Sequence, residues 1–103
     1  MGSEEKVRDC YKIPDDGPAL ECIKQVIKQT RNEPGCRPRM ILLVQENCAG
    51  CAEEKARYKA DIESGLVEMV DVYSPEGLEI ANRNGVESVP ALLVLDCKNI
   101  AIE

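Results

Sequence analysis

The sequence predicts one α/β domain, a three-layer α/β/α arrangement around a mixed sheet, and three observations carry this prediction. The chain has 103 residues, a length that suits a single domain. Two aliphatic runs, Met40–Val44 and Ala91–Leu95, have the length of buried strands. Helix-forming segments alternate with strand-like segments, which implies parallel strands covered by helices. No linker divides residues 1–103, and residues 1–5 are expected to be disordered.

The N-terminal segment is expected to contain one strand and one helix. Val7–Ile13 alternates loosely between apolar and polar residues and meets the dense turn signal Pro14–Pro18, so we expect a short edge strand there. A helix follows from Pro18, because apolar residues recur at helical spacing over 20–27 and proline suits a first helical turn. Asn32–Gly35 contains a helix breaker and a turn former and is expected to lie beyond its end.

The middle of the chain predicts a strand, a helix and a second strand. Met40–Gln45 is a short aliphatic run typical of a fully buried strand. Asn47 is a natural N-cap for the next segment, where strong helix formers fill 52–60 and Ser64-Gly65 ends the helix. Leu66–Tyr73 is the expected second strand.

The C-terminal segment predicts a short helix and a closing hairpin. Ser74–Gly77 opens the helix and Asn84-Gly85 ends it. The strand Ala91–Leu95 then leads through a turn into a last short strand, Ile100–Ile102. The expected order is β-α-β-α-β-α-β-β, with an antiparallel edge formed by the hairpin.

The composition excludes several classes of function. With six cysteines and no histidine, the chain cannot form a Ser-His or Cys-His catalytic pair or a zinc site that needs an imidazole ligand. A formal charge of -6 argues against binding of nucleic acid. The aliphatic runs are too short for a membrane span, and the N-terminus lacks the apolar stretch of a signal peptide, so we expect a cytoplasmic protein that does not bind membranes.

The most informative motif is Cys48-Ala49-Gly50-Cys51, at the transition from a buried strand into a helix. Two intervening residues in a first helical turn bring the sulfur atoms close enough to form a disulfide. The backbone N–H groups and the positive end of the helix dipole favour a thiolate at Cys48, which predicts that Cys48 is the nucleophile. Cys51, less exposed, would resolve the mixed disulfide. Gly50 lets the turn tighten and Ala49 leaves the sulfur accessible.

The charged residues around this motif have competing effects. Glu46, Glu53 and Glu54 flank the two cysteines, and nearby negative charge disfavours a thiolate. Lys55 and the basic residues that follow it would act in the opposite direction if they faced the sulfur. Because these charges compete, the helix terminus is expected to decide the direction of the shift, which lowers the pKa of Cys48 below that of a free thiol.

The strand, the CxxC motif and the helix, followed by Val89-Pro90 before an aliphatic strand, resemble the thioredoxin and glutaredoxin-like superfamily from Arg39 onward. The resemblance implies a thioredoxin-like fold and a disulfide oxidoreductase active in electron transport and cell redox homeostasis, with Cys48 and Cys51 as its redox-active center. It also implies a cis Val89–Pro90 bond that, together with Ala49 and Gly50, contacts a disulfide-containing protein substrate. No cofactor or metal is implied, only a reductase or other electron donor.

Several positions differ from the family pattern. Asn47 stands where the family usually has tryptophan, no proline lies between the cysteines, and Leu42 stands where thioredoxins carry a buried aspartate. These differences indicate a thioredoxin-fold dithiol protein rather than a thioredoxin. The C-terminal helix of the family is expected to be missing, which would leave one face of the sheet less covered and favour a homodimer or a docking partner.

Two other interpretations of the cysteines stay open. The first is a non-catalytic redox sensor or protein-interaction adaptor built on the same fold. The second is a metal or iron–sulfur site that combines the dithiol with two of the remaining four cysteines. Of these four, Cys22 is expected to be a small core residue, whereas Cys36 and Cys97 are expected in exposed loops. Bridges between Cys10 and Cys36 or between Cys22 and Cys97 are both compatible with the sequence.

Overall fold

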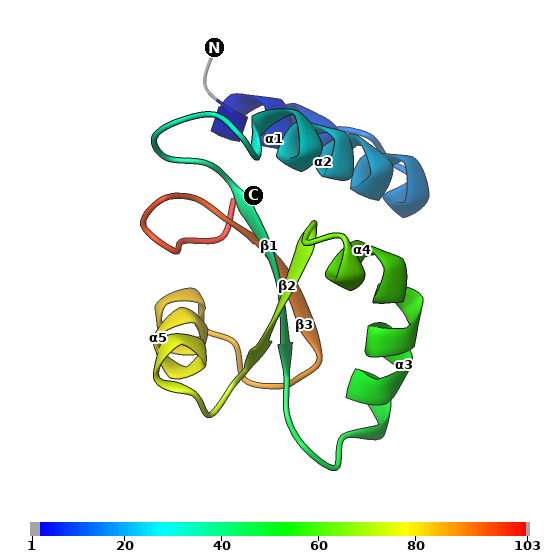
Figure 1. Ribbon diagram of the computed structural model, residues 1–103, viewed down its shortest axis with the longest axis vertical. Helices are drawn as coiled ribbons and strands as arrows, with labels where there is room; N and C mark the ends of the chain where they lie inside the picture. The colour runs from blue at the N-terminus through cyan, green and yellow to red at the C-terminus, as the bar shows by residue number, and fades with distance from the viewer. Residues whose placement is uncertain (1–2, 103) are drawn as a thin grey trace.

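Three strands form a mixed sheet at the centre of the computed structural model, which describes residues 3–102 (Figure 1). Five helices surround the sheet within these residues. The elements in chain order are α1 (Ser3–Tyr11), α2 (Asp16–Thr30), β1 (Arg39–Val44), α3 (Ala49–Arg57), α4 (Lys59–Glu63), β2 (Val67–Asp71), α5 (Pro75–Asn84) and β3 (Ala91–Leu95). None of these helices has the length and apolarity needed to span a bilayer.

The aliphatic run of β1 occupies the middle of the sheet, in the order β2-β1-β3. β1 runs parallel to β2, with Met40 opposite Val67, and antiparallel to β3, with Leu43 opposite Ala91. All of β1 except Arg39 is buried, because the strand has a neighbour on each edge and helices over both faces. The prediction of a mixed sheet with a buried aliphatic strand is therefore confirmed, although the strand covers Arg39–Val44 and Gln45 lies outside it.

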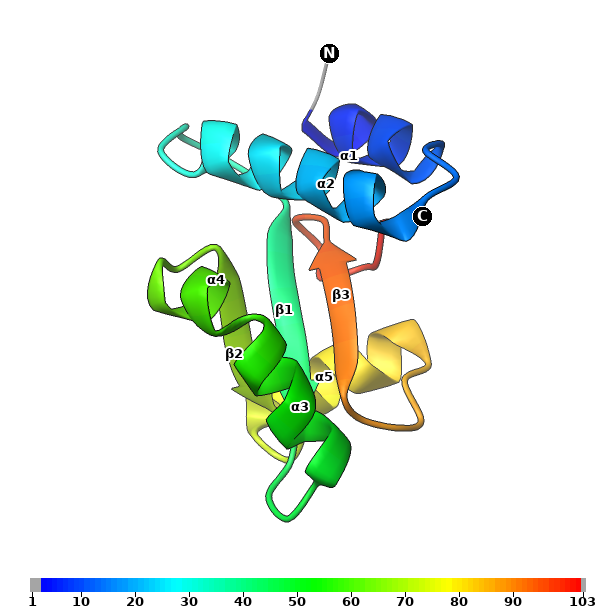
Figure 2. The ribbon, with the colours of Figure 1, turned by 90° about the vertical axis from the view of Figure 1, so that its right-hand side faces the viewer.

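Helices cover the sheet on its two faces, which gives the predicted three layers. α5 lies on one face, and α3 and α4 lie on the other (Figure 1). Successive residues of β1 point to opposite faces, so Ile41 packs with Ile80 of α5, while Leu42 belongs to the core on the α3 side. α1 and α2 lie across the end of the sheet where β1 begins (Figure 2). Ile23 of α2 joins the core on the α3 side.

The prediction of an edge strand over Val7–Ile13 is wrong, because this segment belongs mainly to helix α1. Val7 and Cys10 lie three residues apart, on one side of the helix, and both are fully buried against α2. Residues 3–5 are helical rather than disordered, and residues 1 and 2 lie outside the described range. α2 begins two residues before Pro18, because the side chain of Asp15 accepts a hydrogen bond from the backbone N–H of Gly17 and caps the helix.

The predicted last strand, Ile100–Ile102, is reduced to an isolated bridge between Leu95 and Ala101. Two backbone hydrogen bonds join this segment to the end of β3, from the N–H of Ile102 to the carbonyl of Val94 at 2.8 Å and from the N–H of Asp96 to the carbonyl of Ile100 at 2.9 Å, and side chains bind the other N–H groups. The carboxylate of Asp96 accepts hydrogen bonds from two backbone N–H groups in the turn, and the side-chain oxygen of Asn84 accepts one from Ala101 at 2.7 Å. The described chain therefore has the order α-α-β-α-α-β-α-β instead of the expected alternation.

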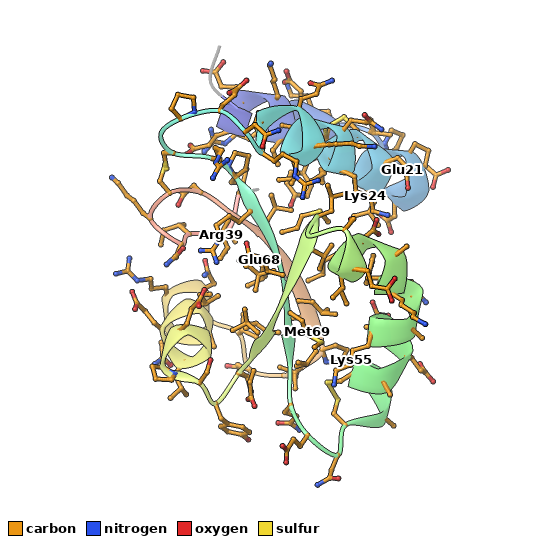
Figure 3. All side chains as sticks on the ribbon, viewed as in Figure 1. Glu21, Lys24, Arg39, Lys55, Glu68 and Met69 are labelled. Carbon is orange, nitrogen blue, oxygen red and sulfur yellow. A yellow bond between two sulfur atoms is a disulfide. The ribbon has the colours of Figure 1, made fainter. Side chains whose placement is uncertain are left out.

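The remaining predicted elements are confirmed with small shifts. The predicted helix over 52–60 begins earlier, at Ala49, and is divided at Tyr58 into α3 and α4. The hydroxyl of Ser74 caps α5, and Gly85 ends it with a left-handed φ of 62°. A partly buried ion pair joins α2 to α4: Lys24 Nζ lies 2.8 Å from the carboxylate of Asp61 (Lys24 is labelled in Figure 3). This hydrogen bond is the main reason why the pKa of Lys24 is raised.

Candidate functional site

The chain between β1 and α3 carries the predicted dithiol. Asn47 has a left-handed φ of 56°, a conformation that asparagine adopts more readily than most residues. Cys48 follows with an extended backbone (φ -111°, ψ 110°) and is the N-cap of α3. The prediction that Asn47 caps this helix is therefore wrong, because a left-handed residue does not have the extended geometry of an N-cap. The cap position belongs to the first cysteine of the motif.

Cys48 Sγ lies at the N-terminus of α3, where unpaired backbone N–H groups point out of the helix. It accepts a hydrogen bond from the backbone N–H of Cys51 at 3.0 Å. Cys48 and Cys51 are joined by a disulfide, with Cys48 half-buried and Cys51 fully buried. The same N–H and the helix dipole would stabilise negative charge on Cys48 Sγ when the disulfide is reduced. The expected difference in exposure between the two cysteines is confirmed.

The loop before β3 packs against the dithiol. The Val89–Pro90 peptide bond is cis, as the family resemblance implied. Cys48 Sγ lies 4.0 Å from the carbonyl oxygen of Val89. Gly50 approaches Pro90 so closely that a Cβ atom at position 50 would lie 3.2 Å from Pro90 Cδ. The structure therefore brings the CxxC motif and Val89-Pro90 together, and Gly50 permits this approach.

A groove of about 450 Å³ extends from Val89 along α5. Two large apolar side chains on its wall are exposed, Tyr73 at 72% and Leu78 at 46%. From the sequence, Tyr73 is expected in a strand, and Leu78 is expected among the apolar positions of the short helix together with Ile80. Leu78 comes two residues before the buried Ile80 and therefore lies near the opposite side of the helix, a spacing that could have identified it. The full lining is Gln45, Val72, Tyr73, Leu78, Ala81, Asn82, Val86, Glu87, Ser88 and Val89.

The acidic residues near the motif are placed so that they oppose a thiolate at Cys48 less strongly than the helix terminus favours it. Glu46 and Glu53 are exposed to solvent, where salt and water screen their charges. Glu54 is paired with Arg57 at 3.5 Å. The negative charges that would oppose a thiolate at Cys48 are thus screened or paired, whereas the N–H of Cys51 contacts the sulfur directly.

We expect reduced Cys48 to react with iodoacetamide at lower pH than a free thiol does. The alkylation rate should reach half its maximum below about pH 8.5, which is the ordinary pKa of a free cysteine thiol. The helix N-terminus and the N–H of Cys51 stabilise the reactive thiolate, whereas buried Cys51 should remain largely unmodified. Peptide mapping after timed alkylation measures each site separately. A half-maximum at or above that of a free thiol would contradict activation of Cys48.

The other four cysteines form two disulfides. Cys10 in α1 is bonded to Cys22 in α2, and Cys36 is bonded to Cys97 across two loops. The pairings considered from the sequence are therefore wrong, and Cys22 is a bonded residue rather than a single core cysteine. The predicted exposure of Cys36 and Cys97 is confirmed. Within residues 3–102, no group of three or more histidine, cysteine or acidic side chains is placed to hold a metal ion.

Comparison of the chain with family models, curated proteins and solved structures found no match. The dithiol and the loop that packs on it are therefore the features of the molecule that indicate a function. These elements gather Cys48, Ala49, Gly50 and Cys51 beside Val89 and Pro90 at one end of the sheet.

Proposed function

We propose that this protein is a thiol-disulfide oxidoreductase with a thioredoxin-like fold. The observation that carries the proposal is the position of Cys48 at the N-cap of α3, where its sulfur accepts a hydrogen bond from Cys51 and faces the carbonyl of Val89. Two features of the fold support it. The dithiol follows the central strand of the sheet, and β3 begins directly after the cis proline and runs antiparallel to that strand.

The reaction would proceed in two exchanges. In the reduced protein, the Cys48 thiolate attacks one sulfur of a substrate disulfide, forms a Cys48–substrate disulfide and expels the other substrate sulfur as a thiolate. The Cys51 thiolate then attacks Cys48 Sγ, which restores the Cys48–Cys51 disulfide and releases the second substrate thiolate. Two electrons pass to the substrate, so a reductase or another dithiol must reduce the protein before the next turnover. The opposite direction uses the same steps in reverse.

The substrate is proposed to be a protein segment that contains a disulfide. The half-buried sulfur of Cys48 is accessible beside Ala49, which is exposed. The backbone of Val89 lies next to that sulfur and can hydrogen-bond to an extended chain. The groove that begins at Val89 exposes Tyr73 and Leu78, which would contact apolar side chains of the same segment.

Reduction of insulin disulfides by dithiothreitol tests the proposal. We expect the protein to accelerate precipitation of the insulin chains above the dithiothreitol background. A Cys36→Ser/Cys97→Ser variant should keep this activity, since β1 separates that disulfide from Cys48 and the two lie at opposite ends of the strand. A Cys48→Ser variant should have none. Activity at background in the wild type, or activity that survives loss of Cys48, would reject the oxidoreductase and favour a non-catalytic redox sensor.

A further inference from the structure

A second hollow lies at the end of the sheet opposite to Cys48 and contains a second disulfide. It has a volume of about 420 Å³ and is formed by the loop after α2, the start of β1 and the turn after β3. Figure 1 shows that loop beside that turn. The Cys36–Cys97 disulfide joins these two segments and lines the hollow. Both of its residues are exposed to solvent at the edge of the hollow.

The carboxylates that line the hollow already have partners. Glu68 accepts two hydrogen bonds from the guanidinium of Arg39, at 2.9 and 3.0 Å, and the two residues face each other across neighbouring strands (Figure 3). Arg39 also donates to Glu76 at 3.0 Å. The carboxylate of Asp96 accepts hydrogen bonds from two backbone N–H groups of its own turn, at 2.8 and 3.0 Å. These contacts direct the carboxylates toward Arg39 and toward the turn, and none of these described carboxylates forms an ion pair with the other arginines of the hollow.

Two arginines of the hollow have no acidic partner within residues 3–102. Arg31 donates to the backbone carbonyl of Ser64 at 2.8 Å, and neither Arg31 nor Arg37 forms an ion pair with a described carboxylate. Both are exposed, and Arg37 directly follows Cys36. Guanidinium groups bind carboxylates through paired N–H donors, so these two side chains are suited to bind a small dianion.

We propose that the Cys36–Cys97 disulfide is a second exchange site, which reacts with a small thiol that carries two carboxylates. Arg31 and Arg37 bind the carboxylates, and the hollow has room for a molecule of that size. This proposal does not depend on any activity of Cys48 and Cys51.

The exchange has a preferred direction. The thiolate of the small molecule bonds to Cys97 Sγ, the Cys36–Cys97 bond breaks, and its electron pair goes to Cys36 Sγ. Arg37 follows Cys36 in the chain, so its positive charge is expected to favour a thiolate at Cys36. A carboxylate oxygen of Glu4 lies 3.9 Å from Cys97 Sγ, which makes a thiolate at Cys97 the less stable of the two and Cys36 the better leaving group. A second small thiolate can then attack the small-molecule sulfur of the mixed disulfide, which yields a small disulfide and the Cys97 thiolate.

Thiols of different charge test this site in a Cys48→Ser/Cys51→Ser variant, which removes the first dithiol. The probes are mercaptosuccinate, with two carboxylates, 2-mercaptoethanol, which is neutral, and cysteamine, which is cationic. Acid quenching and peptide mapping by mass spectrometry give the rate and the position of the adduct. After correction for thiolate concentration, mercaptosuccinate should react fastest and should be found on Cys97. If this variant does not fold, peptide mapping of the wild type separates the two sites.

Charge variants test whether the arginines cause the preference. The Arg31→Gln/Arg37→Gln variant should react with mercaptosuccinate about fivefold more slowly, as expected for the loss of two exposed charges. Its rate of reaction with 2-mercaptoethanol should be unchanged. Arg57→Gln/Lys59→Gln makes the same change in net charge on α3 and α4 and should have little effect. Equal slowing with the neutral thiol, no preference for mercaptosuccinate, or an adduct on Cys36 would each overturn the proposal.

Discussion

A Cys51→Ser variant is expected to capture disulfide-containing proteins as long-lived covalent complexes. Cys48 would still attack the substrate disulfide, because it is half-buried and keeps the backbone N–H of residue 51 as a hydrogen-bond donor. The complex would persist because the thiol that releases the substrate is missing. An intramolecular thiol has an effective concentration far above that of thiols in solution, so turnover should fall by at least about 100-fold.

The complex can be measured with insulin or another disulfide protein on a non-reducing gel and by intact-protein mass spectrometry. Addition of dithiothreitol should release the substrate, and Cys48→Ser should form no complex. Cys51 is fully buried in the disulfide-bonded structure, so it should not itself capture the substrate when Cys48 is absent. A Cys51→Ser variant that keeps full turnover would show that Cys51 does not resolve the intermediate. A complex formed equally by Cys48→Ser would reverse the two roles.

The central part of the fold could be predicted because its signals are local. The continuous aliphatic run of β1 is itself the signal of a buried strand, and the cap and end of α5 are encoded by Ser74 and Gly85. The dithiol could be placed for the same reason, since a strand and a run of helix formers flank it directly. These signals required no knowledge of contacts between distant residues.

The parts that were missed depend on tertiary contacts or on side chains that compete with the backbone. The disulfide pairing follows from the packing of α1 on α2 and of one loop on another, which residue spacing does not encode. The last strand is reduced to an isolated bridge, and the side chains of Asn84 and Asp96 accept hydrogen bonds from its backbone N–H groups. The groove beside Val89 is formed by α5, the loops before and after it, and Gln45, which the fold brings there from the end of β1. The cytoplasmic location and the homodimer stay predictions.

A Gly77→Ala variant is expected to lose about 3 kcal/mol of unfolding free energy, because the first turn of α5 packs directly on backbone. A Cβ atom at this buried position would overlap the carbonyl oxygen of Asp71 and would lie 2.9 Å from Val72 Cα. Backbone atoms cannot move aside as the end of a flexible side chain can. The added methyl group should therefore separate α5 from the end of β2. Chemical denaturation monitored by circular dichroism would measure the loss of unfolding free energy.

Gly17→Ala is a matched control, because Gly17 also lies in the first turn of a helix and also donates its N–H to a capping side chain. A Cβ atom there would contact only the side chain of Asp15, at 3.9 Å, so alanine should stabilise the protein slightly by restricting the unfolded chain. Equal stability changes in the two variants would show that backbone overlap is not the cause.

The consequence of Gly77→Ala should reach the dithiol as well. Val72 lines the groove beside Val89, and its backbone N–H donates to the carbonyl of Val44 at 2.9 Å, at the end of the strand that leads to Cys48. A shift of Val72 would therefore disturb both the groove and the segment that positions the nucleophile. We expect Gly77→Ala to slow insulin reduction even at temperatures where the variant is folded, whereas Gly17→Ala should leave the rate unchanged. An unaltered rate in folded Gly77→Ala would show that the groove does not contribute to the reaction.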